Sequence, residues 1–235
     1  MSDFISVKDL GIRAVSHSRM KTHEGCPRKA MYKFIDKLKE PSNDAMDRGL
    51  AVHKELENWL LCVNGEPYEG TGTAPRGMVY DVIRGDVSDY HKSKYTVNAE
   101  QQVAFDKEWQ VCDWFGANAW MRVVFDLAAQ SKCKNHIFLG DYKTGKVYDD
   151  HDQQADLYAV AGYWMGAASV DVAFYYIDQN QVQRYTYDRE ELEALIPVVE
   201  ARAAQVTEDR MFPTNPSWRC RYCHFRKENG GPCVH

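Results

Sequence analysis

Two aspartates and a lysine have the types and spacing that suit metal-assisted hydrolysis. In HIFLGDYKTGK, the alternation of a strand places Asp141 and Lys143 on one face of an apolar run, and Asp126 lies in a second apolar run, AWMRVVFDLAA. Because burying an unpaired charge is costly, both acids must meet a cation or face a cleft. Two converging acids suit Mg²⁺ or Mn²⁺, and a neighbouring lysine can steady the attacking water. Either segment alone also fits a salt bridge or a turn cap, so the prediction rests on their combination.

Two helical pairs accompany these acids. Gly49 and His53 in RGLAVH are four residues apart, and so are Gln154 and Tyr158 in QADLY. Each pair therefore occupies one helix face, and the glycine permits the close approach of another element. Ordinary helix packing explains either pair alone.

Four of the seven cysteines form a second candidate metal site. Cys220 and Cys223 make a C-x2-C pair in an irregular tail, Cys233 follows, and Cys26 is the obvious fourth ligand. Thiols inside a cell stay reduced, so such a group indicates metal binding before disulfides. Unligated thiols, or a zinc site that uses a histidine such as His224 or His235, are the alternatives. The other three, Cys62, Cys112 and Cys133, lie in helix or strand patterns and fit core or incidental positions.

Basic and aromatic residues interleave in two segments, 28–39 and 218–227, the first of which begins with Arg28 and Lys29. Cations meet phosphates while bases stack on rings, a combination suited to single strands or frayed ends of DNA. The alternative for the first segment is a solvated charged face. The formal net charge of −5 excludes only a surface that is basic all over.

The elements that must position these residues follow from periodicity. We expect one or two helices over 16–39 and another over 46–63, whereas the Gly- and Pro-rich stretch 64–92 is the least interpretable part of the chain. Strands are expected over 96–105, 107–115, 119–129, 136–144, 170–178 and 182–188, with helices over 149–166 and 189–207. This order predicts an α/β fold with a mixed central sheet flanked by helices.

The 235 residues suffice for one domain with a sizeable core. We expect a single domain over 1–235, with helices in 1–65, a catalytic sheet core in 95–187, and a cysteine-rich tail, 211–235, packed on the N-terminal helices. No apolar run approaches the roughly 20 residues of a membrane span, and the N-terminus lacks the layout of a secretion signal. We therefore expect a cytoplasmic protein of a prokaryotic cell or a phage-infected host.

The segments CPRKAMYKF, RGLAVH, VVFD, GDYKTGK and QADLY, in this order, resemble the RecB-type exonuclease branch of the PD-(D/E)xK nuclease superfamily. The resemblance implies a restriction-endonuclease-like fold. It implies that His53, Asp126, Asp141 and the main-chain carbonyl of Tyr142 bind Mg²⁺ or Mn²⁺, and that Lys143 is the catalytic lysine. Gln154 and Tyr158 would contact DNA or support the site, and Glu100 is a further acidic candidate.

Many members of this branch carry a [4Fe–4S] cluster bound by one early and three late cysteines. The resemblance thus implies such a cluster on Cys26, Cys220, Cys223 and Cys233, as a staple between the tail and the N-terminal helices. The gap before Cys233 is longer than usual, so a histidine stays open as the fourth ligand.

Three functions compete at this point. The first is a metal-dependent deoxyribonuclease, expected to act as an exonuclease in DNA processing, recombination or repair. The second is a non-catalytic DNA-binding module that keeps the fold and cluster, although such a module has no reason to retain Asp126, Asp141 and Lys143. The third is a cysteine hydrolase that uses Cys112 or Cys133; no local setting indicates a lowered thiol pKa, so it ranks last.

Overall fold

The computed structural model describes residues 11–70, 72, 75–133, 135–146 and 151–235, and its centre is one six-stranded sheet. The strands are β1 (Thr96–Phe105), β2 (Val111–Cys112), β3 (Met121–Gln130), β4 (His136–Lys143), β5 (Ser169–Tyr176) and β6 (Gln181–Tyr187). Their order across the sheet is β2-β1-β3-β4-β5-β6. Only β4 and β5 run parallel, because helix α5 connects them, and the other neighbours are antiparallel.

Six α-helices surround the sheet in the described part of the chain. They are α1 (His17–Gly25), α2 (Pro27–Phe34), α3 (Asp44–Asn64), α4 (Met78–Lys92), α5 (Asp152–Trp164) and α6 (Arg189–Thr207). Local signals fix several ends: the Asn43 side chain caps α3, left-handed Gly65 ends it, and Asp188 with Glu191 forms a capping box on α6.

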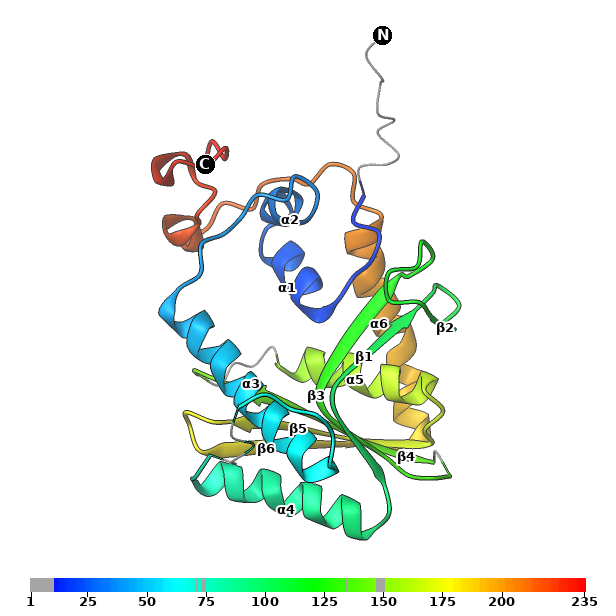
Figure 1. Ribbon diagram of the computed structural model, residues 1–235. Helices are drawn as coiled ribbons and strands as arrows, with labels where there is room; N and C mark the ends of the chain where they lie inside the picture. Colours follow the sequence, from blue (N-terminus) through cyan, green and yellow to red (C-terminus); the bar gives the residue numbers. More distant parts are fainter. Residues whose placement is uncertain (1–10, 71, 73–74, 134, 147–150) are drawn as a thin grey trace.

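The helices cover both faces of the sheet (Figure 1). Helices α5 and α6 pack together on one face, where Leu157 and Val199 belong to the larger apolar cluster. Helices α3 and α4 cover the other face, where Leu56 and Ile83 belong to a second cluster. The expected mixed sheet flanked by helices is confirmed.

A fork in the sheet lies at its centre. Strands β3 and β4 pair from Gln130↔Ile137 only as far as Leu127↔Gly140, and then separate. Asp126 and Asp141 are the first residues beyond the last pair, so the fork places an acid on each of its two arms. On β1, Glu100 has a positive φ of 47° and interrupts the pairing opposite Asp126.

The C-terminal tail lies against the N-terminal helices, beside α2 in Figure 1, and contains the short 3-10 helices η3 (Trp218–Tyr222) and η4 (Lys227–Asn229). The amide of Arg28 donates to the carbonyl of Pro213, and the Tyr32 and Phe225 rings lie 5.6 Å apart. These contacts agree with the expectation that the tail packs on the N-terminal helices. The division of the chain into one domain with these parts stays a prediction.

Residues 64–92, the part of the sequence that was least interpretable, contain helix α4, whose buried Val79, Ile83 and Val87 follow helical spacing despite the Gly- and Pro-rich residues before it. One sequence expectation was wrong. The strand expected over 107–115 is reduced to Val111–Cys112, because a turn at 106–110 and a left-handed Trp109 precede it.

Two further expectations touch residues outside the described part of the chain. Positions 149 and 150 of the expected helix lie there, and the observed α5 begins at Asp152. Residues 1–10, for which no secretion signal is expected, also lie there. Within the described ranges no helix is both long and apolar enough to span a bilayer.

Candidate active site and metal centres

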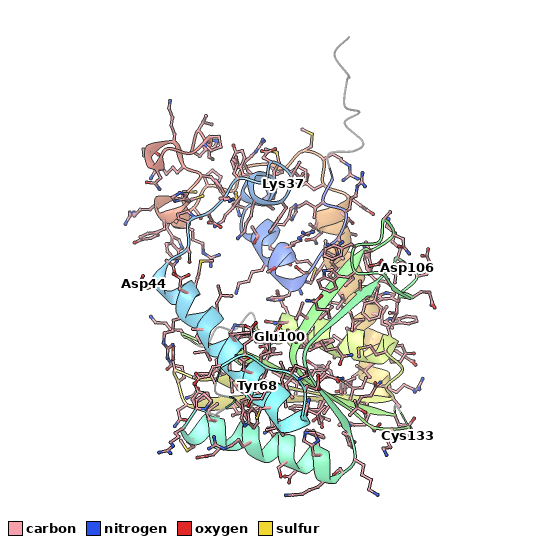
Figure 2. The ribbon with its side chains drawn as sticks, viewed as in Figure 1. Lys37, Asp44, Tyr68, Glu100, Asp106 and Cys133 are labelled. Atoms are coloured by element: carbon pink, nitrogen blue, oxygen red, sulfur yellow. The ribbon has the colours of Figure 1, made fainter. Side chains whose placement is uncertain are left out.

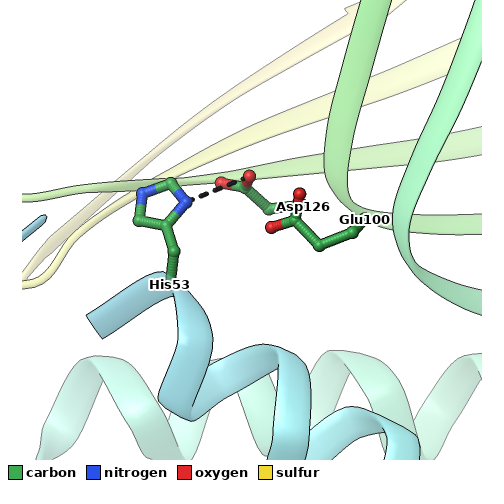
Figure 3. Close-up of side chains that lie close together, drawn as sticks. All are labelled: His53, Glu100 and Asp126. Carbon is green, nitrogen blue, oxygen red and sulfur yellow. Dashed lines mark hydrogen bonds and ion pairs between the residues drawn. The ribbon is translucent and has the colours of Figure 1, made fainter. Parts of the chain in front are cut away.

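Three side chains from three elements meet at the fork: His53 of α3, Glu100 of β1 and Asp126 of β3 (Figure 3). One potential ligand atom from each lies within 4.8 Å of the other two. Figure 2 places Glu100 centrally, between α3 and the strands. We call these three residues and Asp141, together with the three residues that contact Asp141 (Lys143, Gln154 and Tyr158), the acidic centre.

The main chain of one residue, Tyr142, orients the centre. The amide N–H of Tyr142 donates to Oδ2 of Asp126 (2.6 Å), while Nε2 of His53 lies 2.7 Å from the carbonyl oxygen of Tyr142. A carbonyl only accepts, so this imidazole nitrogen donates. Nδ1 of His53 lies 3.2 Å from Oδ1 of Asp126. The carbonyl that the resemblance assigns to the metal thus accepts a hydrogen bond from His53.

Asp141 contacts a different set of residues. Its Oδ2 lies 2.6 Å from Nζ of Lys143, and its Oδ1 accepts from Tyr158 Oη and Gln154 Nε2, both at 2.7 Å. Lys143 also donates to Oε1 of Gln154 at 2.7 Å. Helix α5 therefore holds the Asp141–Lys143 pair through Gln154 and Tyr158, and this places both in a supporting position.

The centre carries more negative charge than its own cations offset. Burial, and then the charge of Asp141, raises the pKa of Asp126, and burial together with Asp126 raises the pKa of Glu100 to about 7. Burial lowers the pKa of His53, but its hydrogen bond with Asp126 and the charge there prevail and raise it to about 9. Burial raises the pKa of Asp141, but the charge of Lys143 together with the hydrogen bonds from Lys143 and Tyr158 outweighs burial, and the net pKa falls. The raised carboxyl pKa values indicate a site suited to a cation.

Close packing brings α3 to the fork. Val52, Leu56 and Leu60 bury one side of the helix, and this turns His53 toward the strands. A Cβ atom on Gly49 would lie 3.1 Å from Oγ1 of Thr144, just after β4. The glycine at this position allows the approach that the sequence indicated.

Comparison with known proteins places this geometry in a family. The family model for the PD-(D/E)XK nuclease superfamily matches residues 14–227. The chain belongs to the PD-(D/E)XK nuclease superfamily. The family expectation is thereby confirmed, and it supports a nuclease that acts on nucleic acid and, as is typical of the family, uses divalent metal.

Two solved structures resemble the chain at low identity. The crystal structure of SSO0001 has 14% identity and a TM-score of 0.42, over 91% of this chain and 83% of that one. A phage-related exonuclease from Haemophilus somnus 129PT has 11% identity and a TM-score of 0.32, over 86% and 96%. No curated protein matches the chain. The assignment thus rests on the family model.

The four candidate cysteines of this PD-(D/E)XK protein line one cavity of about 60 Å³, beside Tyr32 and Phe225. Cys26 joins α1 to α2, and the other three come from the tail. The amide of Ser217 donates to Sγ of Cys220 at 3.3 Å. We call Cys26, Cys220, Cys223 and Cys233 the cysteine cavity; His235 also lines it.

The predicted DNA-contacting residues lie in two places. Gln154 and Tyr158 are in the acidic centre, whereas Arg28 and Lys29 line the cysteine cavity, and Lys29 forms an ion pair with Glu40 at 2.5 Å. The structure therefore does not bring Arg28 or Lys29 into the acidic centre. It does bring Arg19 and Arg122, which the sequence reasoning did not select, to a pocket that also contains Lys143.

Proposed function

We propose that this chain is a Mg²⁺- or Mn²⁺-dependent deoxyribonuclease that degrades DNA from its ends. One observation carries the proposal. The fork between β3 and β4 gathers His53, Glu100 and Asp126 within 4.8 Å, next to the ion pair of Asp141 with Lys143. Hydrolysis of a phosphodiester needs a bound cation and a positively charged side chain held beside it.

The donor set fits a hard divalent cation. Two carboxylates and an imidazole are ligands that Mn²⁺ and Mg²⁺ accept, and ligands on opposite sides of Mg²⁺ lie about 4.2 Å apart. The ligand atoms of the observed group all lie within 4.8 Å of one another, which is close to this size. We assign His53, Glu100 and Asp126 as ligands, with Asp141 and the Tyr142 carbonyl adjacent. A bound cation supplies Lewis acidity that lowers the pKa of water and offsets charge on phosphorus.

Each protein group then has a defined task. Lys143, held by Gln154 at 2.7 Å, points an ammonium group at the reaction site and stabilises the negative charge that develops on the phosphate. Gln154 and Tyr158 fix Asp141, whose charge keeps Lys143 in place. The main-chain N–H of Tyr142 fixes Asp126, and its carbonyl fixes His53.

We assign the cysteine cavity to a [4Fe–4S] cluster. Tetrahedral zinc with bonds of 2.3 Å holds its sulfurs roughly 3.8 Å apart. Among the residues that the structure describes, the acidic centre supplies the only group of three or more potential ligands within 4.8 Å. No three of the described sulfurs therefore lie as close together as in a tetrahedral zinc site, and a larger cluster, in which each thiolate binds its own iron, tolerates the wider spacing. The cluster would join the tail to α1 and α2.

A nuclease assay tests the catalytic proposal. Wild type should degrade end-labelled linear DNA in Mg²⁺ or Mn²⁺ and spare covalently closed circles. Lys143→Ala should reduce the rate at least about a hundredfold, whereas Lys92→Ala, at an exposed site on α4, should not. Equal rates for wild type and Lys143→Ala would contradict the enzyme assignment, and cutting of circles would contradict action from ends.

Spectroscopy tests the cluster separately. Anaerobically purified protein should be brown, with broad absorption near about 400 nm and iron in excess of one atom per chain. Colourless protein with stoichiometric zinc would overturn this assignment and leave the nuclease proposal standing.

A further inference from the structure

A second cavity opens beside the acidic centre. It has a volume of about 420 Å³ and shares Lys143, Gln154 and Tyr158 with that centre. Its other walls are the first turn of α1, the side chain of Trp114, and residues 122–124 at the start of β3. The backbone pairing of Val15 with Met121 brings these two distant segments of the chain together.

Two arginines line this cavity: Arg19 from α1 and Arg122 from β3. Burial, and then the charge of Arg122, lowers the pKa of Arg19, so the two guanidiniums lie close enough to repel each other. Arg19 donates to the carbonyl of Ala14, and the buried Nε of Arg122 has no hydrogen-bond partner. Within the described ranges, neither arginine forms an ion pair with a carboxylate.

Several arginines elsewhere in the described residues meet acids, as in Arg48 with Asp178 and Arg184 with Asp86. Two mutually repelling guanidiniums beside Lys143 instead make a positive concavity in a chain of net charge −5. A planar guanidinium fork matches phosphate oxygens, so the missing counter-charge suits a phosphate.

Trp114 supplies an aromatic surface at the same place. Cζ of Arg122 lies 5.6 Å from the centre of the Trp114 ring, so the guanidinium and the indole are adjacent. An aromatic ring next to a cation is the combination that binds a base and its phosphate in single-stranded nucleic acid.

We propose that this cavity binds one unpaired nucleotide of the strand being cut, with its phosphate on Arg19 and Arg122 and its base on Trp114. The site lies next to Lys143 and so holds the strand in place for cleavage. This proposal rests on the proposed nuclease function. It adds that the enzyme recognises a single-stranded segment, through a phosphate and a base adjacent to the scissile bond.

Equilibrium binding of short fluorescent single-stranded oligonucleotides, in Ca²⁺ instead of Mg²⁺ to slow cleavage, tests the site. Arg122→Gln should weaken binding about tenfold and reduce the slope of log affinity against log salt by about 0.7. Arg122→Lys should lie between it and wild type. Arg189→Gln, an exposed arginine on α6, is the matched control and should bind as wild type does.

Trp114→Leu tests the base contact while both guanidiniums remain. It should weaken binding of an ordinary oligonucleotide about tenfold and leave binding of an abasic strand at the wild-type level. The melting temperature of each variant shows whether a loss of binding is only a loss of folding. If Arg122→Gln does not fold, Arg122→Lys and Trp114→Leu test the site in its place.

The same variants show whether the bound phosphate is at the end of the strand or inside it. A larger effect of Arg122→Gln on strands with phosphorylated ends identifies a terminal phosphate, and an equal effect on circular single strands identifies an internal one; either supports the site. If wild type cuts DNA but Arg122→Gln, Arg122→Lys and Trp114→Leu all bind as wild type does, the site is refuted and the nuclease proposal stands. If wild type neither binds nor cuts DNA, both fail.

Discussion

The acidic centre and the cysteine cavity are built in opposite ways. The acidic centre lies on the central sheet, where Asp126 and Asp141 are buried and held by hydrogen bonds from the protein itself. The cysteine cavity joins a helix junction to a tail whose regular structure is limited to two 3-10 turns. The comparison teaches that packing preorganises the acidic centre, whereas the proposed cluster would be what organises the chain around the cysteine cavity.

The largest expected effect breaks catalysis and leaves folding intact. Asp126→Asn should lower the rate of DNA cleavage at least about a hundredfold, because the cation loses a charged ligand. Without metal it should unfold at the same temperature as wild type or a higher one, because burial disfavours the charge that it removes. Asp89→Asn, at an exposed position, is the control. A large drop in melting temperature would contradict a preorganised centre.

The cysteine cavity should respond in the reverse manner. Cys220→Ser should make trypsin cut residues 211–235 at least about tenfold faster, because loss of the cluster releases the tail. Melting of the sheet should change little. Mass spectrometry of the fragments locates the cuts, and Cys133→Ser, which changes an exposed thiol, is the control. A tail as resistant as that of wild type would show that protein contacts alone hold it.

The dependence on pH sharpens the charge argument at the acidic centre. The pKa of Glu100 is raised to about 7, so the metal-free protein loses stability as the pH rises through that value and the carboxylate becomes charged. Mg²⁺ would offset that charge. The rise in melting temperature on adding Mg²⁺ should therefore be larger at pH 8 than at pH 6, as measured by thermal shift. Glu100→Gln should reduce this difference between the two pH values. An equal increase at both values would contradict the assignment of Glu100.

The smallest effect concerns the packing that positions α5. A Cβ on Gly162 would lie 2.8 Å from Cγ2 of Val170, so Gly162→Ala should cost about 1–3 kcal/mol of unfolding free energy and lower activity by moving Gln154 and Tyr158. Gly85→Ala meets nothing within 4 Å on α4 and should stabilise the protein by up to about 1 kcal/mol. Denaturant titration measures both. Equal values would show that α5 is not tightly seated.

Much of the fold could be predicted because its strands and long helices have regular periodicity. The helix over 189–207 and the strand over 96–105 match the observed bounds. Helix α4 was missed because Gly77 precedes it and Gly85 interrupts it, although Val79, Ile83 and Val87 carried the signal. Prediction from local sequence fails where glycines lie before or within a helix, even if its apolar residues have helical spacing.

The candidate site was predictable only in part, for a different reason. Asp126, Asp141, Lys143 and His53 lie in recognisable segments, whereas the position of Glu100 at the centre depends on a left-handed backbone that alternation does not anticipate. Arg19 and Arg122 are far apart in sequence, and only the pairing of Val15 with Met121 brings them together. Such long-range juxtaposition leaves no local trace.

The main-chain groups of Tyr142 act in a way that side-chain mutagenesis cannot detect. Its amide holds Asp126, its carbonyl holds His53, and its side chain belongs to the apolar cluster beneath α3 and α4. Alanine scanning would therefore miss it, because every replacement keeps the peptide group. Only a change to the backbone itself, such as an amide-to-ester substitution that deletes the donor, would reveal that the residue between the acid and the lysine acts through its main chain.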